Sequence, residues 1–104
     1  MTASARPALG AEEPVVRAAS VLAAEIDGEV VALDVAKGLC YALDPIGSRI
    51  WDLLSTPASA RSISDALVES YEVDLADCER DVLRLLEELV EEGLAVLPAR
   101  TPDA

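Results

Sequence analysis

Residues 18–43 alternate between large apolar positions and small or polar positions, the period-two pattern that is typical of β-strands. Asp27-Gly28 lies in the middle of the first half of this stretch and is a strong signal for a two-residue hairpin turn. A hairpin is therefore predicted here. The turn pairs Ile26 with Glu29, Ala24 with Val31, and Leu22 with Leu33.

A second turn is predicted at Ala36-Lys37-Gly38. If Gly38 takes the left-handed conformation of a three-residue loop, Val35 faces Leu39, Leu33 faces Tyr41 and Val31 faces Leu43. Both registers then place the same large apolar side chains on one face of a three-stranded meander, and we expect this face to be the buried one. Its members are Leu22, Ala24, Ile26, Val31, Leu33, Val35, Leu39, Tyr41 and Leu43, while the opposite face carries Ala23, Val30, Ala32, Asp34, Cys40 and Ala42.

Residues 44–92 change to the period of 3.6 that is typical of helices. Asp44 is suited to cap the first helix and Pro45 to begin it, and Thr56-Pro57 ends it. A second helix is predicted to begin at Ser62, with Asp65 at its third position, and to run toward Tyr71. The third is predicted from Asp74 to a stop at Gly93. We assign Ile50, Trp51 and Leu54 to the core, and residues 94–97 to a short strand or an apolar plug.

The elements in this order predict an α+β fold, a winged helix-turn-helix-like domain with a three-stranded antiparallel meander followed by three helices. At 104 residues the chain has the length of one domain. We place it at residues 15–97, between a flexible N-terminal tail at 1–14 and a C-terminal tail at 98–104. The chain has no long apolar run and no signal-peptide pattern, so we expect a cytoplasmic protein without a membrane role.

Composition argues against several functions. Cys40 and Cys78 lie far apart in a chain without histidine, so neither a metal site nor any other cofactor is expected. No serine or acid has a catalytic base within reach in the sequence, and we expect no enzyme activity. The net charge is −12, and the third helix carries eight acidic residues against Arg80 and Arg84. A DNA-recognition helix must neutralise phosphates, so this acidic helix is poorly suited to bind DNA, and no nucleic-acid partner is expected. A winged-helix DNA-binding regulator is nevertheless the alternative that the fold suggests.

The strand at residues 39–43 is an edge of the predicted meander, and it carries no charge or proline that would guard the edge. Three explanations stay open at this point. The N-terminal tail could cover the edge, a second copy of a non-catalytic dimerising subunit could cover it, or the edge could accept a peptide as an additional strand.

Several motifs in the chain resemble one known family, the PqqD-like RiPP recognition element, and especially the discrete B1 proteins of lasso peptide biosynthesis. The resemblance spans residues 18–97 and is most specific at a strand-to-helix segment. The matching residues are Leu33-Asp34, Gly38, Tyr41, Leu43-Asp44-Pro45, Gly47 and Ile50-Trp51, followed by Tyr71-Glu72-Val73-Asp74 and then by Asp81-Val82, Leu86 and Leu89.

This resemblance implies a module that captures the N-terminal leader of a ribosomally made precursor peptide. The leader would add as an antiparallel strand to residues 39–43, in a groove beside the third helix, and would bring a Tyr-x-x-Pro element. The implied partners are a transglutaminase-like leader peptidase of the B2 type and an ATP-dependent macrocyclase. Carried onto this chain, the leader-binding residues are Leu39, Cys40, Tyr41, Ala42, Leu43, Cys78, Asp81, Val82 and Leu85. For Val82 and Leu85 ordinary core packing is the competing interpretation, and for Asp81 it is a solvated surface position.

Overall fold

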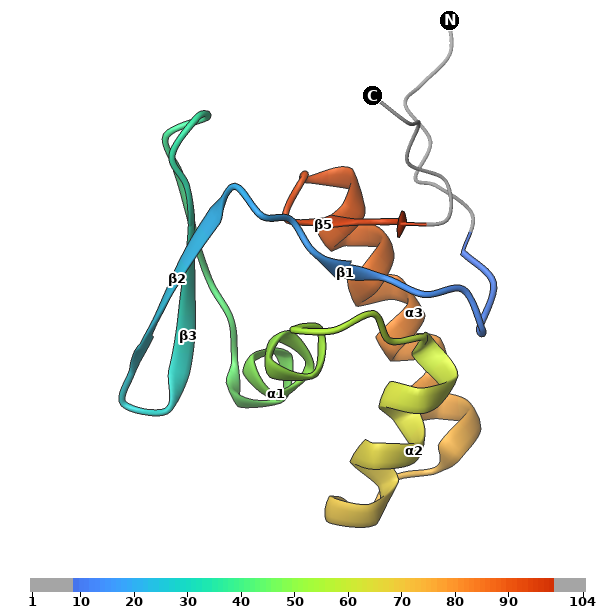
Figure 1. Cartoon of the computed structure of the whole chain (residues 1–104). Coiled ribbons are helices and arrows are strands. Elements are labelled where there is room, and N and C mark those ends of the chain that lie inside the picture. Colours follow the sequence, from blue (N-terminus) through green and yellow to red (C-terminus); the bar gives the residue numbers. More distant parts are fainter. Residues whose placement is uncertain (1–8, 99–104) are drawn as a thin grey trace, which may run out of the picture.

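The computed structural model describes residues 9–98. These residues form two small sheets and three helices around one core, and Figure 1 shows their arrangement. Along the chain the elements are β1 (Val16–Arg17), β2 (Val21–Ile26), β3 (Glu29–Asp34), β4 (Leu39–Ala42), α1 (Pro45–Leu53), α2 (Ala60–Ser70), α3 (Leu75–Glu91) and β5 (Ala95–Val96). The predicted α+β class, with a three-stranded antiparallel sheet and three helices, is confirmed. Residues 1–8 and 99–104, which belong to the two predicted tails, lie outside the described residues.

The larger sheet has the strand order β2-β3-β4. Its first hairpin has the predicted register, with Ile26 opposite Glu29 and Leu22 opposite Leu33. Asp27 and Gly28 both have positive φ, at 54° and 82°, as the tight turn between two twisted strands requires.

The second hairpin differs from the prediction by one residue. Val31 pairs with Ala42, Ala32 with Tyr41, and Leu33 with Cys40, so the loop from Val35 to Gly38 has four residues instead of three. Gly38 does adopt the left-handed conformation, at φ 68°, and its N–H donates to the carbonyl of Asp34 over 2.8 Å. Because side chains alternate along a strand, this slip of one residue turns β4 over relative to β3.

The buried face of β3 is also the opposite of the expected one, and none of the residues of β2 is buried. Val30, Ala32 and Asp34 are buried, whereas Leu22 is 60% exposed and Ile26 58% exposed. Ala24, Leu33, Val35 and Leu39 are also exposed. The expectation for the end of the sheet was right, since Tyr41 and Leu43 both pack against the core.

The helices begin and end at side-chain and backbone caps. Asp44 caps α1 and Asp74 caps α3, as predicted. The start of α2 was predicted three residues too late: Ser59 is its N-cap, and Ser59 and Ser62 form a reciprocal capping box. Gly93 has φ 83°, and the N–H groups of Gly93 and Leu94 donate to the carbonyls of Val90 and Leu89, which closes the end of α3.

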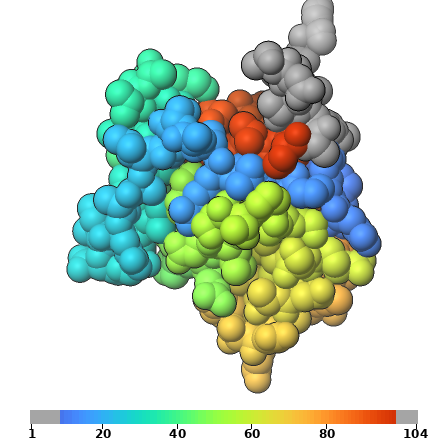
Figure 2. Space-filling model, viewed as in Figure 1, coloured from blue at the N-terminus to red at the C-terminus, as the bar shows by residue number. Residues whose placement is uncertain are grey.

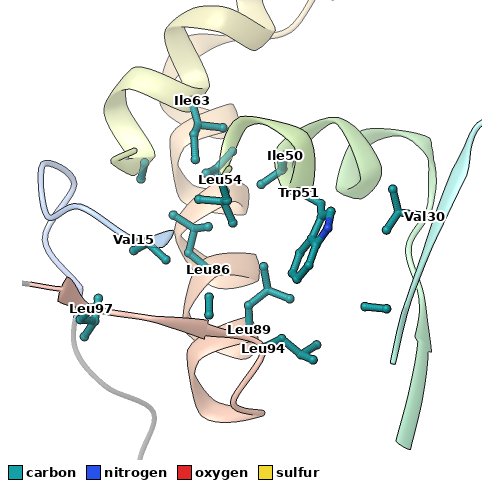
Figure 3. Packing of buried hydrophobic residues seen from close by; sticks show 14 of the residues in the cluster. Val15, Val30, Ile50, Trp51, Leu54, Ile63, Leu86, Leu89, Leu94 and Leu97 are labelled. Atoms are coloured by element: carbon teal, nitrogen blue, oxygen red, sulfur yellow. The ribbon is translucent and has the colours of Figure 1, made fainter. Parts of the chain in front are cut away.

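The core lies between the helices and the inner face of the sheet (Figure 3). Ile50, Trp51 and Leu54 are at most 2% exposed, which confirms their assignment to the core. The guanidinium of Arg17 lies over the Trp51 ring at 5.1 Å, and its Nε donates to the Trp51 carbonyl over 2.8 Å.

The N-terminal segment closes the other side of the core. β1 pairs antiparallel with β5, which resolves residues 94–97 in favour of a short strand. Val15 is fully buried and forms a bridge with Ala58, and Leu9 packs against the core. In the space-filling view this blue segment lies against the red C-terminal strand (Figure 2). It is therefore on β5, and not on β4, that the described N-terminal residues pair.

Candidate functional site

β4 lies at the edge of its sheet, with β3 on one side, and no strand among residues 9–98 pairs with its other side. The N–H of Leu43 donates to the carbonyl of Val30 over 2.9 Å. Since hydrogen-bonded positions alternate along an antiparallel pair, Leu39 and Tyr41 also bond to β3. Cys40 and Ala42 consequently direct their N–H and C=O groups, four in total, at the open edge.

The junction of β4 and α1 is held by two side chains. Asp44 accepts a hydrogen bond from the N–H of Gly47 over 2.6 Å, and a Cβ on Gly47 would lie 3.1 Å from the same carboxylate oxygen. The hydroxyl of Ser48, which is buried, accepts from the N–H of Val30 over 2.7 Å and donates to the carbonyl of Leu43 over 3.2 Å. These bonds fix the end of the open edge relative to α1, which is anchored in the core.

The other end of β4 is tied to the end of α3. The Nζ of Lys37 donates to the carbonyl of Glu92 over 2.8 Å, and the hydroxyl of Tyr41 donates to the carboxylate of Glu92 over 3.1 Å. Partial burial raises the pKa of Tyr41, and the hydrogen bond and negative charge of Glu92 raise it further. Both ends of β4 are therefore attached, and the middle of its outer edge is left accessible.

A groove of about 720 Å³ opens between this edge and the helices. One wall comes from the end of β4 and from α1, and the other from the end of α2 and the first four turns of α3. The lining residues are Ala42, Leu43, Asp44, Ile46, Gly47, Ile50, Leu67, Tyr71, Val73, Asp74, Asp77, Cys78, Asp81, Val82, Leu85 and Glu88.

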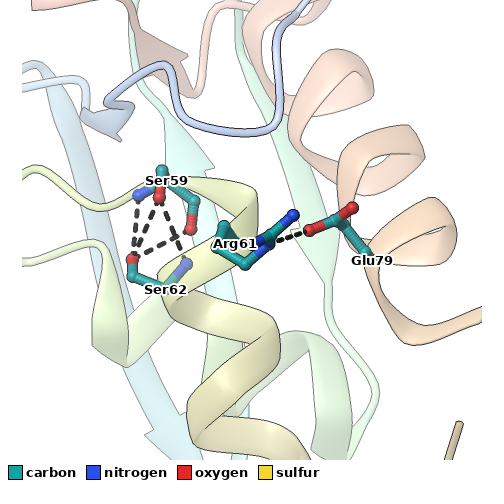
Figure 4. Close-up of polar contacts among 4 residues, drawn as sticks. All are labelled: Ser59, Arg61, Ser62 and Glu79. Atoms are coloured by element: carbon teal, nitrogen blue, oxygen red, sulfur yellow. Dashed lines mark hydrogen bonds and ion pairs between the residues drawn. The ribbon is translucent and has the colours of Figure 1, made fainter. Parts of the chain in front are cut away.

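The wall formed by α2 and α3 also carries an ion pair between the two helices. Arg61 Nε lies 2.6 Å from a carboxylate oxygen of Glu79, and this ion pair is drawn beside the Ser59–Ser62 capping box in Figure 4. The hydrogen bond to Glu79 raises the pKa of Arg61, and the negative charge of Glu79 raises it further. The ion pair joins the first turn of α2 to α3, and buried residues of both helices, among them Leu67 and Val82, pack in one core.

Six of the nine predicted site residues line the groove, namely Ala42, Leu43, Cys78, Asp81, Val82 and Leu85. Among them Val82 is only 3% exposed and serves the core, whereas Leu85 is half-buried. Leu39, Cys40 and Tyr41 lie outside the groove, on the same strand. Cys40 has backbone groups at the open edge that a peptide could pair with. The side chain of Tyr41 instead contacts Glu92.

Several residues that line the groove were not expected from the sequence. Among them are three apolar residues, Ile46, Tyr71 and Val73, and two acids, Asp77 and Glu88. The two acids could have been found, because Asp77, Asp81 and Glu88 follow one another at intervals of four and seven residues and so lie on one helix face. The three apolar residues come from α1 and from the link between α2 and α3. No periodicity connects them, and only the folded chain brings them together.

The groove has an apolar floor and acidic side chains, and it lies beside the open edge of β4. Within residues 9–98 no group of three or more Cys, Asp and Glu side chains is placed to hold a metal ion. No helix in the same range is long and apolar enough to cross a membrane. The arrangement fits an extended peptide that pairs with β4 and inserts apolar side chains toward α3.

Comparison with known proteins points in the same direction. Residues 29–95 match the model of the family described as coenzyme PQQ synthesis protein D (PqqD). A comparison with curated protein sequences finds no match.

Two solved structures are similar to the chain. One is TbiB1 in complex with the TbiA(beta) leader peptide, with 34% identity, a TM-score of 0.72, and coverage of 85% of this chain and 99% of that one. The other is a lasso peptide synthetase B1 complexed with the leader peptide, with 28% identity, a TM-score of 0.64, and coverage of 79% and 96%.

Proposed function

Because this chain belongs to the PqqD family, we propose that it is a RiPP recognition element that binds the leader of a ribosomally made precursor peptide, with a lasso peptide as the product. The observation that carries the proposal is the open edge of β4 beside an apolar groove. The two similar structures both contain a leader peptide, and both match the chain over nearly their whole length.

In this proposal the leader adds as an antiparallel strand to β4. The N–H and C=O groups of Cys40 and Ala42 form the backbone hydrogen bonds, while Leu85 and Cys78 contact apolar side chains of the leader in the groove. Four backbone bonds at about 1 kcal/mol each and two apolar anchors at about 2 kcal/mol each give about 8 kcal/mol before the ordering of the peptide is subtracted. Net binding in the micromolar range or tighter therefore requires that the anchors fit the groove well.

We further propose that the protein is a cytoplasmic adaptor without catalytic activity of its own. It would present the bound leader to a leader peptidase of the B2 type and to an ATP-dependent macrocyclase. The antiparallel arrangement supports this role, because the C-terminal end of the leader, which continues into the core peptide, would leave the groove near the Lys37 turn and away from the α2–α3 link.

Fluorescence anisotropy tests the proposal with two labelled probes: the TbiA(beta) leader, and the leader of a precursor peptide encoded beside the gene of this chain. We expect saturable binding of at least one leader, and no binding of the same peptides with their residues in scrambled order. Equal binding of the scrambled peptides would contradict the proposal. A gel retardation assay with duplex DNA at low salt tests the winged-helix alternative, for which the acidic α3 predicts no shift.

A further inference from the structure

The groove beside β4 has an acidic side and no basic one. Five of the residues that line it are acids, namely Asp44, Asp74, Asp77, Asp81 and Glu88, and none of the lining residues is a lysine or an arginine. Asp44 and Asp74 already accept hydrogen bonds from the first turns of α1 and α3. Asp77, Asp81 and Glu88 lie along α3, from its first turn onward, and form the acidic rim of the groove.

The acidic rim runs parallel to an apolar stripe on the same helix. Cys78, Val82 and Leu85 follow each other at intervals of four and three residues and line the floor of the groove. Asp77 and Asp81 lie one residue before Cys78 and Val82, with side chains that are 66% and 68% exposed. A peptide in the groove would thus have apolar surface beneath it and carboxylates along its outer side.

Asp77 and Asp81 can accept a new partner at little cost. Asp77 is paired with Arg80 at 3.1 Å and Asp81 with Arg84 at 2.8 Å, and both arginines lie on the exposed side of α3, outside the groove. Ion pairs as exposed as these contribute little to stability, because water screens both charges. A cation from the groove side could therefore add to these pairs or replace them.

We propose that the peptide bound in this groove carries a lysine or arginine at a fixed distance from its apolar anchor, and that Asp77 and Asp81 select this residue and thereby set the binding register. The inference rests on the proposed function, since it concerns the peptide that pairs with β4. A lysine or arginine suits the site because its aliphatic stem can lie along Cys78 and Val82 while its charge reaches the rim.

The physical reason for such selection is that the other parts of the site read little sequence. Backbone bonds at Cys40 and Ala42 are the same for every peptide, and an apolar floor distinguishes side chains mainly by size. A row of carboxylates at one wall attracts a cation and repels an acidic side chain, which favours one register over its neighbours and one class of peptide over another.

A phage-displayed library of random 16-residue peptides, selected on the full immobilised chain, tests the inference. Wild-type protein is expected to enrich peptides with Lys or Arg at a constant spacing from an apolar residue. The Asp77→Asn/Asp81→Asn variant is expected to lose this cation preference and to keep the apolar one, and Asp81→Lys is expected to favour Asp or Glu at that spacing. Glu69→Lys is the matched control, because Glu69 is an exposed acid of α2 outside the groove.

Affinities of one selected peptide and its Lys→Glu counterpart provide a second measurement. Because the rim carboxylates attract the lysine and repel the glutamate, we expect the counterpart to bind wild type about tenfold more weakly at low salt. The difference should be smaller at 0.5 M salt, which screens the charges. For Asp81→Lys the order of the two affinities should reverse. A cation preference that persists unchanged in the double Asn variant would refute the inference, as would its loss in Glu69→Lys.

The outcomes separate the two proposals. If wild type enriches apolar, strand-compatible peptides without any charge preference, leader binding stands and the selection of a cation is wrong. If wild type enriches no peptide and binds no leader, both are wrong. Circular dichroism of each variant confirms that the fold is kept.

Discussion

Replacement of Ser48 by alanine removes a hydroxyl that joins three elements of the domain. Ser48 lies in the first turn of α1, is 4% exposed, and bonds both to the N–H of Val30 in β3 and to the carbonyl of Leu43 at the end of β4. Val30 is itself only 5% exposed, so its N–H would be left buried without an acceptor. We expect Ser48→Ala to weaken the attachment of the sheet to α1.

The size of the effect follows from these two bonds. A buried donor left without a partner costs about 1–3 kcal/mol, and the lost bond to Leu43 about 1 kcal/mol more, which gives about 3 kcal/mol of unfolding free energy. For a domain of this length, that loss corresponds to a decrease in Tm of about 12 °C. The open edge of β4 would also lose part of its support, so leader binding is expected to weaken as well.

Ser64 is the matched control. It is also a buried serine in a helix, but its hydroxyl has no hydrogen-bond partner within residues 9–98. Ser64→Ala removes an unsatisfied hydroxyl and introduces a better helix former, so its stability should change by less than about 0.5 kcal/mol or increase. Urea unfolding followed by circular dichroism, together with thermal melts, measures both variants. Equal losses for the two serines, or a loss below 0.5 kcal/mol for Ser48→Ala, would refute the reasoning.

Three further variants test the groove, the end of α3 and the contact between Tyr41 and Glu92. Leu85→Asp places a charge in the groove and should reduce leader affinity at least a hundredfold, as measured by anisotropy. Leu83→Asp is the control, because Leu83 is a half-buried leucine of α3 outside the groove, and it should not have this effect. Similar effects of the two variants would reject the groove assignment. Gly93→Ala forces a side chain into φ 83° at the end of α3 and should cost about 1 kcal/mol in urea unfolding; an unchanged midpoint would contradict this. The raised pKa of Tyr41 means that its neutral form is favoured in the folded state, so the stability from this group is present below about pH 10 and is lost as the pH rises above that. Tyr41→Phe should therefore lose less stability above pH 10 than wild type does. An identical loss would disprove the role of the Glu92 contact.

Local rules of the chain were enough to predict the element order and most of the boundaries. The turn at Asp27-Gly28, the cap at Asp44 and the stop at Gly93 each depend on backbone conformations or hydrogen bonds within a few residues. The open edge also followed from the sequence, because a meander leaves its two outer strands as edges and residues 39–43 carry no charged or proline guard. The motifs around Asp44-Pro45 indicated the family.

Tertiary structure decided which face of the sheet is buried and what the groove contains. The pattern favoured burial of the face with the large apolar side chains and a loop of three residues, but the fold buries the face with the smaller side chains and has a loop of four. In the folded chain the small side chains of Val30 and Ala32 face inward and α1 packs on β3, while Leu22 and Ile26 remain exposed. The groove likewise joins β4 and α1 to α2 and α3, which are distant in sequence, and only packing sets the distance between such elements.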